Sequence, residues 1–259
     1  MNGNSMKKIA YANAVADDKV RRFVPPVRVV RESAGVSDSA ALLDGVHTQS
    51  FVHFNPRECI LPPGGEIILD FGLELHGLLT VTTGCMKLSR ARITFGESVS
   101  ETLGTPTQDH AIHQELLSLP QLGQVNFGQT AFRFVRLEIP ADAPEVRLIG
   151  VVATAIYRDW EYRGTFLSDD ERLNRIWEVG AYTVHLNCQD YIYDGVKRDR
   201  LVWMGDLYPE IRTILAAFDE TALVEKSLDF VRDHTPDEKW MNTASSYSCW
   251  WVICQRDFY

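Results

Sequence analysis

The period of the apolar residues changes once along the chain, near Gly164, and this change restricts the fold more than any other feature. Between residues 45 and 160, short apolar runs are separated by turn residues, a pattern typical of β-strands. After Gly164, apolar residues recur at spacings of three and four, which is typical of helices with one buried face. Strands followed by helices, rather than alternating with them, predict a β part and a separate α part.

The strand-like region predicts an antiparallel β-sandwich, because strand patterns follow one another with no helical period between them. The expected strands are segments rich in β-branched residues or alternating in polarity: 66–72, 77–82, 90–96, 132–139 and 146–153. The pattern weakens between residues 98 and 128, where we expect a long loop that carries His110 and His113. Upstream, Pro25 and Pro26 disfavour a helix, and residues 27–30 are expected to form a short edge strand.

Four helices are predicted after the sandwich. The first should start at a capping box formed by Ser168 and Glu171, and its buried face should carry Leu173, Ile176, Trp177, Gly180 and Val184. The others are expected at about 207–218, with Pro209 in the first turn, at 221–234, and from residue 245 or 246 onward. The last helix has no stop signal before Tyr259. We therefore expect three parts: a leader and edge segment (1–44), a β-sandwich domain (45–160) and a helical domain (161–259).

Composition excludes several classes of protein. The net charge of −9 argues against a nucleic-acid partner, and no apolar stretch is long enough for a membrane span. The five cysteines are an odd number and contain no CxxC pair, so neither zinc binding nor complete disulfide pairing is expected. No signal-peptide pattern is present. The expected location is cytoplasmic, although a periplasmic or secreted protein whose signal has been removed would look the same.

One polar segment, residues 191–206, holds most of the residues suited to chemistry. It connects the first two predicted helices, and long connections of this kind are often functional. Sugar hydroxyls can be held by carboxylates, and aromatic faces stack on C–H surfaces. Clustered carboxylates also repel one another, so one of them can keep its proton and act as a general acid. The segment contains three acids, three cations and three aromatic residues: Asp194, Asp199, Asp206, Lys197, Arg198, Arg200, Tyr191, Tyr193 and Trp203.

A purely structural interpretation of these residues agrees with the composition equally well. In it, Arg198 and Arg200 pair with Asp194 and Asp199 as a surface latch, and Asp206 caps the second helix. Composition alone does not separate this interpretation from a sugar site.

The arrangement Asp-x-x-x-Arg-Asp-Arg-Leu-x-Trp-x-Gly-Asp, from Asp194 to Asp206, resembles the active-site signature of glycoside hydrolase family 78, the α-L-rhamnosidases. Residues 68–77 and 132–136 are similar to strands of the β-sandwich that precedes the catalytic barrel of that family. The resemblance covers about residues 55–259. It implies a multidomain protein, β then α, with an antiparallel β-sandwich followed by the first helices of an (α/α)6 barrel. With four predicted helices, we expect this barrel to be truncated.

The resemblance also implies an activity, the inverting hydrolysis of terminal α-L-rhamnose or a related sugar, with no cofactor and no metal. It implies that Asp194 and Asp206 hold sugar hydroxyls, with Arg198 beside them and Trp203 lining the pocket. Asp199 occupies the position at which characterised members carry a general-acid glutamate, so it is expected to be the catalytic acid. Its shorter side chain would set the carboxyl back by about 1.5 Å, and a displacement of ~1 Å can cost ~100-fold in rate.

The resemblance places the general base on a glutamate in later barrel helices, beyond this sequence. Glu210 and Glu225 are instead expected to lie on helix surfaces. We therefore expect the isolated chain to be inactive. Two alternatives remain open: a non-catalytic carbohydrate-binding or scaffold protein, and an (α/α)6 glycosidase for a different sugar. Apolar helix faces left uncovered by an incomplete barrel would favour a homo-oligomer.

Outside the segment, a tryptophan and two histidines have the chemistry of site residues. Trp250 is a candidate for a substrate-binding wall, although core packing suits Trp250 and Trp251 equally well. His110 and His113 have the spacing of a metal-binding pair, but no third ligand is near them in the sequence, so no metal is expected.

Overall fold

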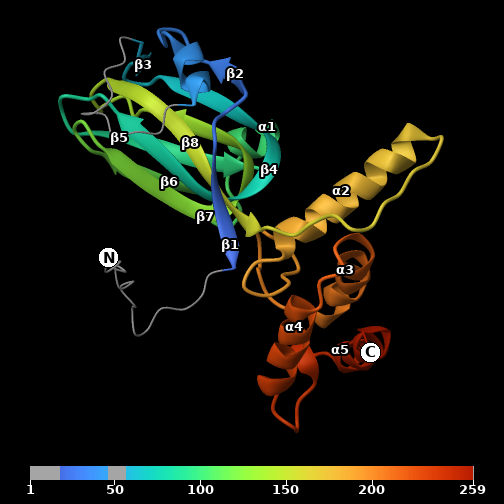
Figure 1. The fold of residues 1–259 in the computed structure, drawn as a ribbon. Helices are drawn as coiled ribbons and strands as arrows, with labels where there is room; N and C mark the ends of the chain where they lie inside the picture. Colours follow the sequence, from blue (N-terminus) through green and yellow to red (C-terminus); the bar gives the residue numbers. More distant parts are fainter. Residues whose placement is uncertain (1–17, 46–56, 259) are drawn as a thin grey trace, which may run out of the picture.

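The computed structural model describes residues 18–45 and 57–258. The predicted leader up to residue 17, part of the predicted sandwich boundary (46–56) and Tyr259 lie outside the described residues. Figure 1 shows the strands gathered in one body together with α1, and the helices that follow β8 in another, with β8 leading from the first to the second. The predicted order of a β part followed by an α part is therefore confirmed.

The strands of the described residues form one antiparallel sheet in the order β1-β8-β4-β7-β5-β6, with β2 beside β4 and β3 beside β8. A short 3-10 helix, Ser39–Asp44, lies between β2 and β3. The strand bounds are β1 Lys19–Val24, β2 Arg28–Glu32, β3 Cys59–Leu61, β4 Glu66–Thr83, β5 Ser89–Gly96, β6 Gln114–Leu119, β7 Gln124–Glu138 and β8 Val146–Arg158. Two of the predicted strands are thus a single long strand, β4.

The sheet surrounds an apolar core to which β3, β4, β5, β7 and β8 contribute side chains. Aromatic rings fill its centre: the ring centroids of Phe95 and Phe132 are 4.6 Å apart, and Phe71 meets Phe132 edge to face at 5.6 Å. These contacts follow from the alternating pattern, because every second residue of a strand points to the same face. The core fixes the sheet as a rigid support for the loops at its edges.

The long loop predicted between residues 98 and 128 is largely wrong. This region contains a short helix, α1 (Val99–Leu103), then β6 and the start of β7, so the irregular part shrinks to residues 104–113. Ser98 caps α1, since its hydroxyl accepts a hydrogen bond from the backbone N–H of Glu101 at 3.2 Å. β6 alternates weakly in sequence and is stabilised by pairing with the edge of β5, a contact distant in sequence.

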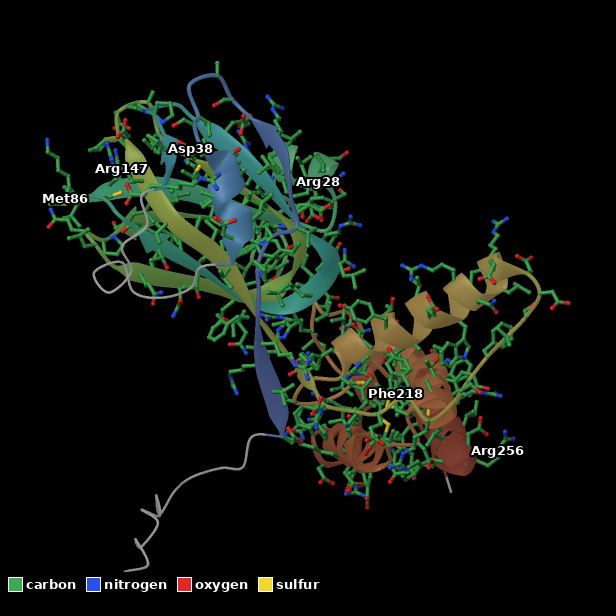
Figure 2. The ribbon with its side chains drawn as sticks, turned by 45° about the horizontal axis from the view of Figure 1, so that its top comes forward. Arg28, Asp38, Met86, Arg147, Phe218 and Arg256 are labelled. Atoms are coloured by element: carbon green, nitrogen blue, oxygen red, sulfur yellow. The ribbon has the colours of Figure 1, made fainter. Side chains whose placement is uncertain are left out.

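The helices are α2 (Glu171–Asn187), α3 (Met204–Ala217), α4 (Ala222–Asp233) and α5 (Ser245–Phe258), with a 3-10 turn at Met241–Thr243 before α5. The predicted inward residues of the second and third helices are buried or half-buried; they are Leu207, Ile211, Ile214, Leu215, Phe218, Leu223, Ser227, Leu228 and Val231. Figure 2 shows Phe218 among the side chains of the helical part, where its ring is completely buried.

Three details of the helices differ from prediction. The N-cap of α2 is Asp170, not Ser168, because the Asp170 carboxylate accepts from the N–H of Arg172 at 2.9 Å. Pro209 lies in the second turn of α3, since this helix already begins at Met204. Much of the predicted buried face of α2 is exposed: Ile176 is 59% exposed, because among the described residues α2 packs mainly on α3 and β8 near its C-terminal half.

The two bodies are joined by direct contacts. The guanidinium of Arg158, at the end of β8, donates through Nε to the backbone oxygen of Gln189 at 3.0 Å. The hydroxyl of Tyr182 in α2 donates to the backbone oxygen of Glu74 in β4. The ring of His185 stacks on Trp160 at 5.7 Å. No helix among the described residues is long and apolar enough to span a bilayer.

Candidate functional site

The polar segment 191–206 connects α2 to α3 and folds into a loop that is closed at its base. The backbone N–H of Asp194 donates to the oxygen of Leu201 at 3.0 Å, and the N–H of Leu201 donates to Oδ1 of Asp194 at 2.9 Å. At the tip of this loop, Asp199 and Arg200 both have a left-handed backbone, with φ of 58° and 53°. This conformation costs a non-glycine residue about 1–2 kcal/mol. The candidate acid therefore sits at a strained position.

The sheet domain holds this strained loop from two sides. On one side, the ammonium of Lys197 pairs with the carboxylate of Glu101 in α1, and the Lys197 side chain is 5% exposed. On the other side, Nη1 of Arg200 donates to the backbone oxygen of Gln129 in β7 at 2.9 Å. Strain persists only where surrounding contacts enforce it, and it is concentrated at functional sites. Asp199 thus lies at the boundary between the sheet domain and the helical part.

The Asp194 carboxyl interacts electrostatically with the two other aspartates of the segment. Burial raises the pKa of the Asp194 carboxyl, and the nearby carboxylates of Asp199 and Asp206 raise it further, against the opposing effect of its backbone hydrogen bond from Leu201. Asp206 is exposed in the first turn of α3. The structure thus brings together the three acids that the sequence pattern groups.

The structure agrees only in part with the interpretation of these residues as a surface latch and a helix cap. Nε of Arg198 lies 3.7 Å from Oδ1 of Asp199, but the Arg198 side chain is 69% exposed, and such a pair contributes little to stability. Arg200 bonds to Gln129 instead of an aspartate. Asp206 is not the helix cap; Trp203 occupies that position without a side-chain bond, and the first amide of α3, on Met204, donates to Oδ1 of Asn242 at 3.1 Å. A surface latch therefore does not account for all of these residues.

The two candidate tryptophans lie in different surroundings. Trp203 is half-buried at the start of α3, edge to face with Tyr247 at 5.7 Å. The ring of Trp250 in α5 packs on Tyr208 at 4.8 Å and belongs to the hydrophobic cluster of the helices. Trp251 packs in the same cluster and donates through its indole N–H to the oxygen of Leu228 at 3.1 Å. Trp203 therefore lies with the other residues of the polar segment, whereas Trp250 packs among the helices.

Glu210 is a carboxyl whose surroundings the sequence pattern predicts wrongly. It was expected on a helix surface, but it is 6% exposed, and its Oε1 accepts from Nδ2 of Asn187 at 2.8 Å. Its Oε2 has no hydrogen-bond partner among the described residues. Burial, together with the charges of Asp206 and Asp194, raises the pKa of Glu210 to about 8. One feature of the sequence indicates that Glu210 lies near the segment: it follows Asp206 by one helical turn, so both residues share one face of α3.

A cavity of about 340 Å³ lies between the sheet domain and the segment. One wall is residues 194–198; the other consists of Glu97, Glu101, Thr107, Asp109, Ala111 and His113. Nε2 of His113 lies 2.8 Å from Oδ1 of Asp109, and its Nδ1 lies 3.6 Å from Oε1 of Glu101. His113 is thus engaged by carboxylates, and within the described ranges no group of His, Cys, Asp and Glu is arranged to hold a metal ion.

A second cavity, of about 540 Å³, lies between β4, β8 and α2. It differs in chemistry, because its lining is largely apolar and aromatic and includes Phe71, Tyr157, Tyr162 and Tyr182. None of the predicted site residues lines it. The polar cavity is therefore the one that belongs to the segment.

Comparisons with known proteins agree with this architecture. Residues 161–255 match the family model described as the bacterial α-L-rhamnosidase six-hairpin glycosidase domain. A rhamnosidase from Klebsiella oxytoca, solved with rhamnose bound, is similar in structure with a TM-score of 0.74 and 23% identity, covering 93% of this chain and 52% of that one. No curated protein matches at the sequence level.

Two further solved structures share the fold. A family 78 rhamnosidase from Bacillus sp. GL1 has a TM-score of 0.65 and 18% identity, covering 85% of this chain and 24% of that one. An α-L-rhamnosidase from Streptomyces avermitilis, complexed with L-rhamnose, has a TM-score of 0.57 and 16% identity, and the match covers 83% of this chain and 19% of that one. The predicted fold class is confirmed: an antiparallel sheet is followed by helices of a six-hairpin domain. The chain spans about half the length of the Klebsiella oxytoca enzyme.

Proposed function

We propose that this chain, whose fold and helical part are rhamnosidase-like, forms the acid side of an inverting glycosidase site of the type grouped in glycoside hydrolase family 78. The substrate class is a glycoside with terminal α-L-rhamnose or a related sugar. The Klebsiella oxytoca and Streptomyces avermitilis proteins were solved with rhamnose bound, which supports this choice of sugar.

One observation carries the proposal: the carboxylates of Asp199 and Asp206 both lie within electrostatic range of Asp194, where the loop from α2 enters α3. The pKa of Asp194 is raised by burial and by these two carboxylates, so the segment as a whole favours holding a proton.

In the proposed reaction, Asp194 and Asp206 accept hydrogen bonds from hydroxyls of the sugar that is cleaved, and Arg198 donates to it. Trp203 closes one side of the pocket. Asp199 gives its proton to the glycosidic oxygen as the bond to the anomeric carbon breaks, while water attacks that carbon from the opposite face. The base that activates this water should lie about 6.5–9.5 Å from the acid. We assign the base to none of residues 1–259.

The left-handed backbone at Asp199 affects where its short side chain places the carboxyl. A carboxyl one methylene shorter than that of glutamate must reach the same oxygen from a different backbone position. The φ of 58° redirects the bond from Cα to Cβ relative to an ordinary loop residue. We propose that this conformation offsets the missing methylene. If it does not, the alternative is a different sugar, whose glycosidic oxygen lies nearer.

A second candidate function is sugar binding without hydrolysis, and the unassigned base favours it for residues 1–259 taken alone. Both candidates use the same aspartates and the same class of partner, a carbohydrate.

The net charge of −9 supports the absence of a nucleic-acid partner. All five cysteines are free, four of them buried and Cys249 exposed, which supports a reducing, cytoplasmic location.

The test compares binding with turnover. We expect this chain to bind L-rhamnose in calorimetry and to show no turnover of 4-nitrophenyl α-L-rhamnoside. Asp206→Asn should weaken binding about tenfold, equivalent to ~1.4 kcal/mol for a lost charged hydrogen bond. Asp199→Asn should leave binding within about threefold, because the acid touches the glycosidic oxygen and not the ring hydroxyls. Asp237→Asn, at an exposed aspartate outside the segment, is the matched control.

In an enzyme that joins these residues to a closed six-hairpin domain, Asp199→Asn should remove about 99% or more of the rhamnoside hydrolysis, as expected when a general acid is lost. Undiminished turnover in that variant would show that Asp199 is not the acid. If this chain binds no rhamnose, or if Asp237→Asn weakens binding as much as Asp206→Asn, the assignment of the sugar site is wrong.

A further inference from the structure

We propose that Glu210 is a positioning residue of the sugar site: its neutral carboxyl joins the two elements that carry the sugar-binding aspartates, Asp194 and Asp206. The inference rests on the proposed function, because it takes these two aspartates as the acceptors of the sugar hydroxyls. It goes further in giving a role to a buried carboxyl to which we assign no contact with the sugar, and in setting the pH range over which the sugar binds.

Glu210 is connected to both of these aspartates. It follows Asp206 by one turn of α3, so the two side chains share a face of that helix. Its Oε1 accepts from Nδ2 of Asn187, the last residue of α2, at 2.8 Å. The backbone oxygen of Asn187 accepts from the N–H of Tyr193 at 3.1 Å, and Tyr193 directly precedes Asp194. Glu210 therefore reaches one aspartate through α3 and the other through Asn187.

The surroundings of the Glu210 carboxyl favour its neutral form. Glu210 is 6% exposed, and its Oε2 has no hydrogen-bond partner among the described residues. Burying a carboxylate is costly unless donors or a cation compensate its charge, and Asn187 supplies one amide donor. Because Oε1 accepts from this amide, the proton belongs on Oε2. Burial raises the pKa of Glu210 to about 8, which agrees with a neutral carboxyl at pH 7.

The groups that face Glu210 come from three elements. On α3 and in the segment they are the carboxyls of Asp206 and Asp194, and the charge of each raises the pKa of Glu210. At the end of α2 they are the amide of Asn187 and the thiol of Cys188. Burial, together with the charge of Glu210, raises the pKa of this thiol, so Cys188 stays uncharged at neutral pH. Among the described residues, the charged groups that shift the pKa of Glu210 are thus both acids.

A charged contact between α3 and α5 lies on another face of α3. Nη1 of Arg212 is 3.8 Å from Oδ2 of Asp257 in α5. Arg212 follows Glu210 by two positions, which is about 200° around a helix, so the two side chains leave from opposite faces. A negative charge on Glu210 would therefore join the charges of two aspartates without help from this arginine.

Sugar binding and the proton of Glu210 are linked. A bound sugar displaces water from around Asp194 and Asp206, and water screens the repulsion between neighbouring charges. Ionising Glu210 then costs more, so the bound sugar should raise the pKa of Glu210 further above about 8. Above pH 8 the bound form holds more protons than the free form, and the affinity for sugar must fall as pH rises. Well below pH 8 both forms are protonated, and Glu210 causes no pH dependence.

The test measures the affinity of the 259-residue chain for methyl α-L-rhamnoside by calorimetry at pH 7 and pH 9.5. The readout is the ratio of the two affinities within each variant. We expect wild type to bind at least about fivefold more weakly at pH 9.5, whereas the two affinities of Glu210→Gln should agree within about twofold. Glutamine keeps an acceptor for Asn187 and cannot ionise. Circular dichroism at pH 9.5 checks that each variant is folded.

Two further variants are controls for the ratio of affinities. Glu225→Gln, at an exposed position of α4, should keep the wild-type ratio. Glu74→Gln should keep it as well. Burial and a hydrogen bond shared with Glu97 raise the pKa of Glu74 to about 7, so this variant shows whether a different carboxyl causes the loss.

A measurement on wild type alone keeps the test independent of how the variants fold. Calorimetry in two buffers of different ionisation enthalpy reports the protons taken up on binding. We expect uptake at pH 8.5 and none at pH 6, because only the higher pH leaves part of the free chain with Glu210 ionised. Absence of uptake at pH 8.5 would contradict the link between the proton and the sugar.

The outcomes separate this inference from the proposed function. Equal wild-type affinities at pH 7 and pH 9.5 would overturn the inference and leave the proposed function intact. A loss at pH 9.5 that persists in Glu210→Gln, or that Glu74→Gln removes, would do the same. Failure of the chain to bind the rhamnoside at pH 7 would overturn the proposed function, and this inference with it.

Discussion

At the scale of single residues, two acids on neighbouring elements are held in opposite ways. Asp199 is kept near solvent at the tip of a strained loop, and Glu210 is buried below the segment beside Asn187. Burial of a carboxyl without a cation penalises its charged form, which is why the pKa of Glu210 is raised to about 8. Glu210 is therefore neutral at pH 7, so it adds no negative charge beside Asp194 and Asp206.

This protonation predicts a pH-dependent stability. An ordinary glutamate ionises near pH 4.5, whereas Glu210 in the folded chain keeps its proton up to about pH 8. Between these values the unfolded state binds fewer protons, so the free energy of unfolding should fall as pH rises, by up to about 1.4 kcal/mol per pH unit. The contribution is fully present below pH 4.5 and lost above pH 8. Urea unfolding at pH 5 and pH 8 measures it.

Glu210→Gln should make the difference in unfolding free energy between pH 5 and pH 8 smaller, because the amide cannot ionise. Part of the difference should remain, since burial and a hydrogen bond shared with Glu97 raise the pKa of Glu74 to about 7. Glu225→Gln, on the exposed side of α4, is the control and should leave the difference unchanged. An equal pH dependence in wild type and Glu210→Gln would mean that Glu210 is ionised in the folded chain.

At the scale of elements, the loop between α2 and α3 takes its shape from the sheet domain. The pair of Lys197 and Glu101 joins this loop to α1, and the Lys197 side chain is almost completely buried. Glu101 has further roles, since its other oxygen accepts from the N–H of Glu97 at 2.7 Å and its carboxylate lies beside His113. One carboxylate thus connects the strained loop, the helix α1 and the wall of the polar cavity.

Removing one partner of this pair should cost more than removing both. Glu101→Gln removes the carboxylate that pairs with the buried Lys197 side chain, and breaking a buried pair in this way typically destabilises by about 3–5 kcal/mol. Adding Lys197→Met removes the lysine charge, so the double variant should recover part of the loss. A double-mutant cycle from urea denaturation measures the coupling. If the effects of the two single changes simply add, Lys197 and Glu101 do not interact in solution.

At the scale of the whole molecule, the helical body presents an uncovered apolar face. Ile176 is largely exposed, and Leu173 and Val179 on α2, with Phe166 and Leu167 before it, are exposed as well. Figure 1 shows α2 extending away from both the sheet and the other helices. In a closed six-hairpin domain such a face would pack on neighbouring helices. Apolar patches left open on a surface promote association.

We expect this chain to associate with itself in a concentration-dependent way in sedimentation velocity experiments. Ile176→Asp, which places a charge in the middle of the apolar face, should shift the distribution toward the monomer. Ser246→Asp, at an exposed position of α5, adds the same single charge outside the apolar face and is the control. A monomer at every concentration would show that this face does not drive association.

The sequence by itself determined the order of the parts, most strands and helices, and the segment that carries the acids. These features depend on local periodicity, on turn residues and on a motif of thirteen consecutive positions (194–206), all of which can be read without knowing what lies nearby in space. The third helix illustrates this: its predicted inward residues, among them Leu223 and Val231, are all buried.

Tertiary structure alone decided which side chains meet. The strand β6 exists because β5 offers it an edge, and Glu210 is buried because α3 packs against the end of α2. The loop that carries Asp199 is anchored by the contacts of Lys197 with Glu101 and of Arg200 with Gln129, which join residues 96 and 71 positions apart in the sequence. Burial, pKa and backbone strain all depend on contacts between distant residues. A one-dimensional pattern therefore located the acids, and the fold set their surroundings.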